Sequence, residues 1–452
     1  MFYLFGLILS SLLTTQYTVY YLQTRMFPNS SLSSSDNMSA CNVNTSTKEY
    51  HERTTVQKTA TQIGIYRALI ESLPALITSS IIGGLSDRYG RTRILIYTTI
   101  LSFLSACLTN ILIYLEINVY YLLFSSAVYS IGGGLYGTLS ICFAYISDVT
   151  SPGKQRTLMI AFLEASIGFG GAVSGFVSGF IIESFGFFYA SIFVSASAFS
   201  SVLVIVLFLP PLRPPDILIS KTTTLENVRA SFIFYFETSP KRYKYVLAIV
   251  SFMFGTFSIL GKLNIEVLYQ LNAPFCWSSL KVGYYSAIST SASMILGVAC
   301  VKVLQKWFVD EVIAIFGGIS GMAANTVEAF ALSDQILFLV PVIGFLNRLV
   351  FPIIRAMLSK LTPPDRQGAL FAGIAVVEIL AGMASSLGTS VIYKETVETM
   401  RGLVFLVLAG SAFLNVFFLL IYRVKNGGSK TLPIQDVTKI ITETQKLIGD
   451  EG

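Results

Sequence analysis

The chain has 452 residues, of which 53% are hydrophobic and only 12% are charged, whereas roughly 25% are charged in an ordinary soluble domain. This composition excludes a soluble globular enzyme, a disordered chain and a small disulfide-rich module, because so apolar a core would have too little polar surface to dissolve it. The remaining class is a protein that crosses the membrane several times. The net charge of +6 is therefore interpreted as a signal of membrane topology, not of nucleic-acid binding.

Apolar runs of helical length follow one another along the whole chain. A helix needs about 20 mostly apolar residues to cross a bilayer, and the runs lack the strict alternation of barrel strands. The sequence therefore predicts an all-α membrane protein with twelve transmembrane helices in two six-helix halves. We expect these helices at about 2–22, 62–84, 94–115, 119–146, 157–182, 187–209, 244–270, 281–302, 310–332, 335–359, 368–393 and 401–422.

Polar segments divide the predicted helices into two groups. The stretch 210–243 begins with a cluster of prolines, which end the sixth helix, and it separates six helices from six. Two halves joined by a polar linker are typical of a transporter whose halves rock about a central site. The predicted domains are an N-terminal bundle at 1–209 with an outer loop at 23–61, a cytoplasmic linker at 210–243, a C-terminal bundle at 244–423 and a cytoplasmic tail at 424–452.

The basic residues indicate how the chain is oriented in the membrane. They gather in the loops after the even-numbered helices, and loops rich in Lys and Arg face the cytosol. Both termini are therefore predicted to be cytoplasmic. The loop at 23–61 then lies on the opposite side, which agrees with its three Asn-x-Ser/Thr sequons for glycosylation at Asn29, Asn37 and Asn44.

The turn between the second and third predicted helices carries a charged motif. Residues 83–93 read GGLSDRYGRTR, in which Asp87 can pair with an arginine and Arg91 can reach Asp148. Such contacts would hold neighbouring helices in one conformation, so we predict a gate made of Asp87, Arg88, Arg91 and Asp148. The alternative is a basic turn with one incidental Asp. The motif resembles the G-x-x-x-D-R-x-G-R-[KR] signature of the major facilitator superfamily, which implies the major facilitator fold.

Segments from the first to the eleventh predicted helix resemble solute carrier family 46, the family of the proton-coupled folate transporter. The resemblance implies proton-coupled symport of an organic anion such as folate, in which Glu164 couples protons and Arg355 contacts the anion. It also implies a disulfide between Cys41 and Cys276, which are both predicted on the oxidising side. The matching segments are TTQY at 14–17, FLEASIG at 162–168, PFCW at 274–277, VGY at 282–284, IRAMLSK at 354–360 and QGALF at 367–371.

The chain departs from the folate transporter in the seventh predicted helix. Where that transporter has a functional histidine, the aligned position here is about Ile259, and the linker also lacks histidine. The substrate therefore stays open between folate and the steroid conjugates, muropeptides and cyclic dinucleotides proposed for other members. The alternative functions are an endosomal or lysosomal exporter of such small polar conjugates, and a receptor or scaffold that does not transport.

Ionisable residues inside a membrane helix are costly unless they are paired or hydrated, so each is a candidate functional residue. Glu164 either carries a proton or is a protonated structural carboxyl. Arg348 and Arg355 are seven residues apart, which would place both on one helix face. There they could bind a carboxylate or phosphate of the substrate. The alternative is that Arg355 neutralises an internal acid and Arg348 packs at a helix end.

Two pairs of opposite charge have the i,i+4 spacing of neighbours on a helix surface, Arg67 with Glu71 and Lys262 with Glu266. Each pair either lines an outward vestibule or simply neutralises itself. Glu328 is a single carboxyl in the ninth predicted helix, and the sequence does not indicate which way it faces.

No predicted helix carries a nucleophile–base pair or a cluster of metal ligands, so the sequence predicts neither an enzyme nor a metal or cofactor site. The expected partners are a small organic anion, protons and the lipid bilayer, and not nucleic acid. In the tail, Glu443, Leu447 and Ile448 form either a dileucine sorting signal for clathrin adaptors or part of a weakly amphipathic helix. The predicted location is the plasma membrane or an endosomal or lysosomal membrane.

Overall fold

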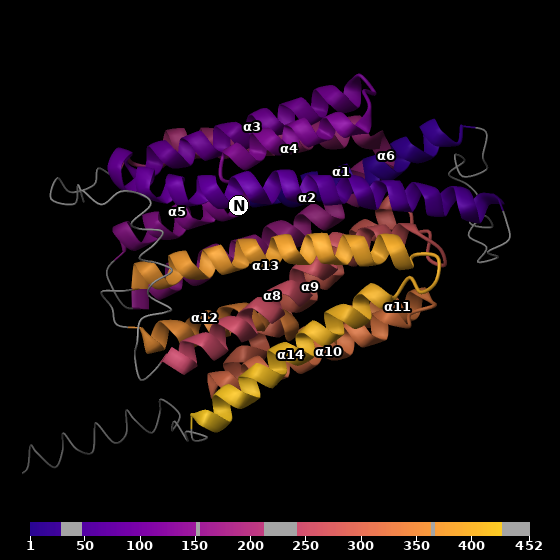
Figure 1. Ribbon diagram of the computed structural model, residues 1–452. Helices are drawn as coiled ribbons and strands as arrows, with labels where there is room; N and C mark the ends of the chain where they lie inside the picture. Colours follow the sequence, from indigo (N-terminus) through magenta and orange to yellow (C-terminus); the bar gives the residue numbers. More distant parts are fainter. Residues whose placement is uncertain (29–47, 151–153, 212–241, 363–366, 427–452) are drawn as a thin grey trace, which may run out of the picture.

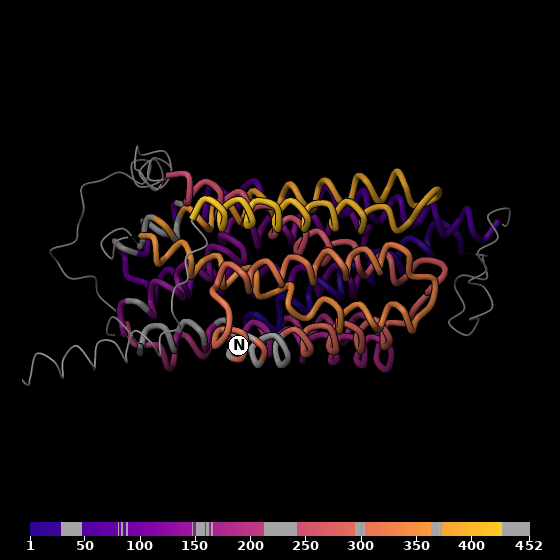
Figure 2. The backbone as a smooth tube through the Cα atoms, turned by 90° about the horizontal axis from the view of Figure 1, so that it is seen from below, coloured from indigo at the N-terminus to yellow at the C-terminus, as the bar shows by residue number. Residues whose placement is uncertain are grey.

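The computed structural model describes residues 1–28, 48–150, 154–211, 242–362 and 367–426. Within these segments some helical side chains lie outside the description, among them those of Asp87, Arg88 and Glu164. The described helices run side by side along a common axis (Figures 1 and 2). We call the end of the molecule where α1 ends at Met26 and α2 begins at Lys48 the outer end, and the opposite end the inner end.

The helices that precede the linker form the upper part of Figure 1. The last of them, α6, runs through Gly186, whose φ of +84° is a conformation that only glycine adopts readily. This break separates the expected fifth and sixth membrane helices. The N-terminal elements are α1 (Phe2–Met26), α2 (Lys48–Tyr89), α3 (Arg91–Tyr114), the short 3₁₀ helix η3 (Val119–Tyr121), α4 (Leu122–Ile131), α5 (Gly134–Val149) and α6 (Lys154–Phe208).

The helices that follow the linker form the lower part of the same view (Figure 1). The C-terminal elements are α8 (Arg242–Leu271), α9 (Ser279–Leu304), α10 (Asp310–Ala329), α11 (Asp334–Ile343), the 3₁₀ helix η5 (Asn347–Leu349), α12 (Val350–Leu361), α13 (Gln367–Thr396) and α14 (Leu403–Lys425). Every run that the sequence predicts to span the membrane coincides with helix in one of these two groups.

Two of the expected helices are interrupted. The helix expected at 119–146 divides between α4 and α5 at Gly133, whose φ is +83°. The helix expected at 335–359 ends as α11 before Gly344 and resumes as α12 after η5. Pro341 lies inside α11 and removes one backbone donor close to that break. Hydropathy does not reveal either interruption, because the apolar run continues across it.

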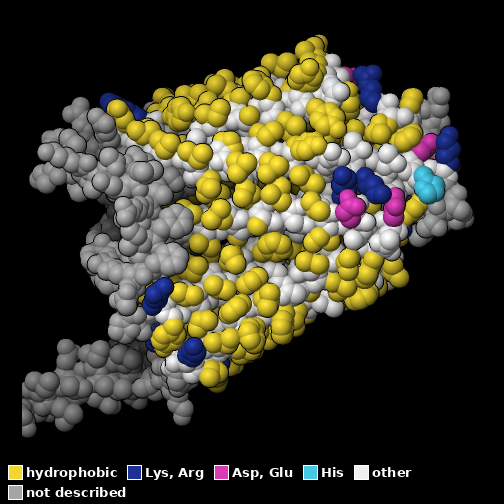
Figure 3. Space-filling model, viewed as in Figure 1, with side chains coloured by type: hydrophobic (Ala, Val, Ile, Leu, Met, Phe, Trp, Pro, Cys, Tyr) yellow, Lys and Arg dark blue, Asp and Glu magenta, His cyan; other side chains and the backbone are white. Residues whose placement is uncertain are grey.

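The flanks of the helix assembly are apolar. Figure 3 shows hydrophobic side chains over most of one face, with the coloured charged side chains gathered toward its ends. Among the described residues, nine helical stretches are long and apolar enough to cross a membrane. A surface of this kind suits hydrocarbon and not water, because contiguous apolar surface is rare on soluble monomers. The count of twelve spans stays a prediction.

The N-terminal and C-terminal helices meet where α6 packs against α9 and α2 against α13. Glycines allow α6 and α9 to approach closely, as small residues do between membrane helices. A Cβ placed on Gly179 of α6 would lie 2.9 Å from Cα of Gly283 on α9 and 2.7 Å from the backbone oxygen of Ser279. Gly175, four residues earlier on α6, makes the same kind of contact, since its Cβ would lie 2.8 Å from the backbone nitrogen of Ala287, so this pair of glycines serves helix packing.

Candidate transport site

A cavity of about 160 Å³ lies between helices of the N-terminal and C-terminal groups. It is formed by α1 and α2 on one side and by α8 and α13 on the other. Its lining mixes hydroxyl groups with aliphatic side chains and contains no aromatic ring. The lining residues are Ser11, Leu12, Thr14, Thr15, Thr18, Ala60, Thr61, Ile63, Gly64, Arg67, Ala68, Glu71, Leu263, Asn264, Val267, Leu268, Ser386 and Ser390.

An ion pair on α2 faces this cavity. Nε of Arg67 lies 2.6 Å from Oε1 of Glu71, one helical turn along. Nη1 of Arg67 also donates to the hydroxyl of Thr14 on α1, and the Ser126 hydroxyl on α4 donates to Oε1 of Glu71 at 2.8 Å. The two charged side chains remain 28% and 29% exposed. The pair therefore neutralises itself and also lines this cavity, while an opening of the cavity to the outer side stays a prediction.

Arg355, which the sequence assigns to substrate binding, forms an ion pair with Glu378. The pair joins α12 to α13, and the Glu378 side chain is only 10% exposed. The Arg355 guanidinium also lies over the ring of Phe252 on α8, at 5.9 Å from the ring centre. Arg355 is not among the residues that line the cavity. The alternative in which Arg355 neutralises an internal acid thus has a partner in Glu378, while the side chain of Glu164 lies outside the description.

Arg348 does not share a continuous helix with Arg355. It belongs to η5, and α12 begins only at Val350. The seven-residue spacing therefore does not by itself decide whether the two guanidiniums share a face, because the argument assumed an unbroken α-helix. The carboxylate of Glu266 on α8 acts electrostatically on the Arg348 guanidinium.

A buried network of charges connects α8 to α10. Nζ of Lys262 lies 2.5 Å from Oε2 of Glu328 and 3.4 Å from Oε1 of Glu266. The Glu328 side chain is fully buried. The sequence paired Lys262 with Glu266 alone, because only that contact is local to one helix. A helical-wheel argument could not find Glu328, which arrives from another helix.

At the inner end, the predicted gate is present in part. Nε of Arg91 on α3 lies 3.0 Å from Oδ2 of Asp148 at the end of α5, and Nη1 of Arg91 lies 2.5 Å from the Ser86 hydroxyl. Arg91 thus reaches Asp148, as the sequence motif suggested. The side chains of Asp87 and Arg88 lie outside the description, and the gating role of all four residues stays a prediction.

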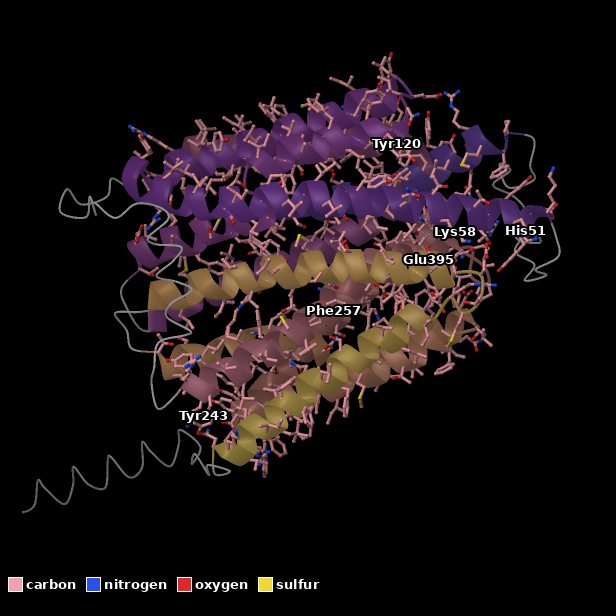
Figure 4. The ribbon with its side chains drawn as sticks, in the orientation of Figure 1. His51, Lys58, Tyr120, Tyr243, Phe257 and Glu395 are labelled. Atoms are coloured by element: carbon pink, nitrogen blue, oxygen red, sulfur yellow. The ribbon has the colours of Figure 1, made fainter. Side chains whose placement is uncertain are left out.

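At the outer end, contacts join the N-terminal helices to the C-terminal ones. Nζ of Lys58 on α2 lies 2.7 Å from Oε1 of Glu398, just beyond α13. Arg53 of α2 donates to Sγ of Cys276, in the segment between α8 and α9. Figure 4 shows Lys58 of α2 and Glu395 of α13 at this end of the molecule. These contacts link the two groups of helices at the outer end.

Several predicted residues fall outside the described segments. They are Cys41 with its proposed bridge to Cys276, the sequons at Asn29, Asn37 and Asn44, and the tail motif of Glu443, Leu447 and Ile448. Their assignments stay predictions. Within the described segments, no group of three or more His, Cys, Asp or Glu side chains could hold a metal ion.

The fold and the helix-lined cavity define a class of membrane transporter, and comparisons with known proteins agree. Residues 42–389 match the family model of the Major Facilitator Superfamily. The structure of the human organic anion transporter MFSD10 (TETRAN) superposes with a TM-score of 0.64 at 18% identity, over 92% of this chain and 98% of that one. A D-xylose-proton symporter superposes with a TM-score of 0.62 at 16% identity, over 92% and 95%. The chain belongs to the major facilitator superfamily and is a multi-pass membrane transporter, not an enzyme.

Curated relatives narrow the family further. The lysosomal proton-coupled steroid conjugate and bile acid symporter SLC46A3 of Homo sapiens is 28% identical over 440 residues, which cover 96% of this chain and 95% of that protein. The proton-coupled folate transporter of Bos taurus is 30% identical over 345 residues, which cover 76% and 74%. Within the superfamily, the chain is a member of solute carrier family 46.

Proposed function

We propose that the protein carries an organic anion across a membrane together with protons. The observation that carries this proposal is the cavity shared by α1, α2, α8 and α13, with an Arg–Glu ion pair in its wall. When the two groups of helices rock against each other, a site between them is exposed first to one side of the membrane and then to the other. Two relatives named above are proton-coupled symporters, which supports the coupling ion.

Coupling to protons lowers the electrical cost of moving an anion across a membrane. Moving one negative charge into a compartment that is negative inside costs about 2.3 kcal/mol per 100 mV. Protons that travel with the anion cancel this charge, and an acidic starting compartment adds further drive. The transporter therefore needs an acid that gains a proton on one side and loses it on the other.

The family resemblance proposes Glu164 of α6 as that acid. Arg355 and Arg348 are proposed to attract the anion, and the ion pair of Arg355 with Glu378 indicates how. Protonation of Glu378 would remove the competing negative charge, so that Arg355 could attract a carboxylate or sulfate more strongly. Asp87, Arg88, Arg91 and Asp148 are proposed to close the inner side.

The lining of the cavity suits the anionic end of a steroid conjugate or bile acid better than folate, although about 160 Å³ encloses only part of either molecule in this conformation. Its apolar wall is aliphatic, with Leu12, Ile63 and Leu263 among its members, and its lining has no aromatic ring that could stack on a pteridine. The corresponding location is the lysosomal membrane, with export of the anion from the lysosome, since the name of the human relative describes it as lysosomal. Glu443, Leu447 and Ile448 would then direct sorting by clathrin adaptors, whereas a folate transporter at the plasma membrane is the alternative.

Flux through the purified protein in proteoliposomes tests the proposal. We expect labelled taurocholate and estrone sulfate to accumulate when the outside is acidic, and the accumulation to collapse when a protonophore is added. Protein-free liposomes and labelled folate are run in parallel. Accumulation of folate alone would reassign the substrate, and absence of flux for every anion would favour a receptor or scaffold.

Glu164→Gln tests the proposed proton carrier. We expect this variant to lose uptake driven by a pH difference and to keep exchange of labelled for unlabelled anion, because exchange needs no net proton movement. Arg355→Ala should lose binding of the anion itself. If Glu164→Gln still accumulates substrate in response to outside acid, another carboxyl carries the proton.

A further inference from the structure

The ion pair in the cavity wall is built so that an anion and a proton can act on it together. Among the described residues that line the cavity, Arg67 and Glu71 are the charged ones, and their formal charges cancel. The guanidinium is held in place by Glu71 through Nε and by Thr14 through Nη1. Nη2 takes part in neither bond, so the guanidinium retains N–H groups for the forked hydrogen bonds that a carboxylate or sulfate accepts.

The carboxylate of Glu71 can change its charge without losing its place. Both hydrogen bonds to the carboxylate, from Arg67 Nε at 2.6 Å and from the Ser126 hydroxyl at 2.8 Å, are accepted by Oε1. The Ser130 hydroxyl holds the same turn of α2 through the backbone oxygen of Glu71, at 2.8 Å. A proton added at Oε2 would leave these three bonds intact and would remove the negative charge.

We propose that Arg67 binds the anionic group of the substrate and that Glu71 takes up one proton for each anionic charge bound there. The inference rests on the proposed function and adds a site of coupling in the cavity itself. While Glu71 is ionised, an anion on Arg67 adds an uncompensated negative charge to a partly buried site. Once Glu71 is protonated, Arg67 balances the anion. Each ligand therefore strengthens binding of the other by the same factor.

The surroundings leave Glu71 as the acid of this site. From α1 and α13 the neighbouring groups are hydroxyls, Thr14 on the first helix and Ser386 and Ser390 on the second. From α4 the nearby titratable group is the phenol of Tyr129. The amine of Lys262 on α8 is one residue from the cavity-lining Leu263 and is held by Glu328 and Glu266.

The two remaining helices that pack against α2 do so nearer its inner end. α5 approaches α2 at Ala75 and Ser79, one to two turns beyond Glu71, and α3 follows the turn at Gly90. The charges there are those of Arg91 and Asp148, which pair with each other. The next charged pair on α13 is the one between its Glu378 and Arg355 of α12.

This arrangement predicts the class of ligand. One guanidinium selects a single carboxylate, sulfate or sulfonate group. The surrounding hydroxyls of Ser11, Thr18 and Thr61, together with the amide of Asn264, suit a body with hydroxyl or amide groups. The ligand that fits is a monoanion on a hydroxylated aliphatic skeleton, accompanied by one proton, so that the loaded site is electrically neutral.

Binding of taurocholate to the purified full-length protein, measured from acidic to neutral pH, tests the inference. Taurocholate serves as the probe because its sulfonate does not titrate over this range. For the wild type we expect the Kd to rise by about tenfold per pH unit above the pKa of the linked carboxyl, as one linked proton requires. Glu71→Gln, which copies the protonated shape, should bind with a Kd that does not change with pH and equals the wild-type value at acid pH. Glu116→Gln is the matched control, because Glu116 pairs with Arg25 in an exposed position.

Arg67→Gln should lose probe binding at every pH, and Arg67→Lys should retain part of it; elution as a monodisperse peak establishes that each variant is folded. A pH slope in Glu71→Gln equal to that of Glu116→Gln would overturn the inference, and so would unchanged binding by Arg67→Gln or absence of binding by the wild type. Proton-driven uptake that survives with an unchanged slope in Glu71→Gln leaves the proposed function standing and removes only this site. If Glu71→Gln loses the pH slope of binding but the wild type shows no proton-driven uptake, this site stands and the proposed transport function is removed.

Discussion

At the scale of single residues, the charges inside the C-terminal helices are stabilised by one another. Lys262 is shared by Glu328 and Glu266, and the buried Glu328 has no water to replace a lost partner. Removing a charge from water costs several kcal/mol, and only a close opposite charge offsets this cost. The loss of one member of this network of three charges should therefore cost more stability than the intact network adds.

Lys262→Met should lower the free energy of unfolding by about 3–5 kcal/mol, because it leaves buried carboxylates without their cation. The double change Lys262→Met with Glu328→Leu should recover most of this loss. Thermal unfolding of the purified protein in detergent measures both. Arg25→Ala is the control, since its pair with Glu116 is exposed and such pairs contribute about 0–1 kcal/mol. A double variant as unstable as the single one would contradict this account.

At the scale of elements, glycines decide how closely helices approach and where they break. Gly179 lies in the tight contact between α6 and α9, whereas Gly410 of α14 has no neighbour within 4 Å of its would-be Cβ. Both lie inside helices, where alanine is favoured over glycine by about 1 kcal/mol. The two positions thus share a backbone preference and differ in the space around them.

Gly179→Ala should therefore destabilise the protein by about 1–3 kcal/mol through overpacking, while Gly410→Ala should be neutral or slightly stabilising. The measurement is the midpoint of thermal unfolding for the two variants and the wild type, together with uptake. Because α6 and α9 belong to different halves, Gly179→Ala should also slow transport. Equal midpoints for the two variants would show that the close helix contact is not maintained in the membrane.

At the scale of the whole molecule, the two groups of helices are joined on the outer side of the cavity. Lys58 with Glu398 and Arg53 with Cys276 connect them there. For alternating access these contacts must break each time the cavity opens outward. A covalent link directly between positions 58 and 398 would hold the outer side closed.

Lys58→Cys combined with Glu398→Cys should therefore stop uptake once the two thiols are oxidised to a disulfide, and a reductant should restore it. Each single variant under the same oxidation is the control. The readout is uptake in proteoliposomes before oxidation, after it and after reduction. Full activity of the cross-linked double variant would mean that the outer side does not need to open.

The orientation of the molecule gives a further prediction. If the loop at 23–61 faces the lumen or the exterior, Asn29, Asn37 and Asn44 become glycosylated in a eukaryotic host, and glycosidase treatment should increase gel mobility. Replacing all three by Gln should remove the shift. Labelling of Cys41 and Cys276 by a thiol reagent should then require a reductant, because the proposed bridge lies on the same side. If glycosidase treatment leaves the gel mobility of the mature protein unchanged while the sequons are intact, the predicted orientation is wrong.

The sequence by itself determined where the helices lie, which family they belong to and which charges are neighbours on one helix. Those properties are local: a run of apolar residues, a signature after the second helix, or the i,i+4 spacing of Arg67 and Glu71. It could not determine where the helices break, since the apolar run continues through Gly133 and Gly344.

Only the tertiary structure decided which distant side chains meet. Arg355 joins Glu378, Lys262 joins Glu328, and Arg67 joins Thr14 across helix boundaries. The physical reason is that lipid is as apolar as the protein interior, so the hydrophobic pattern does not distinguish the face of a membrane helix that meets lipid from the face that meets its neighbours. The rotation of each helix, and with it the partner of each buried charge, is fixed by packing between helices.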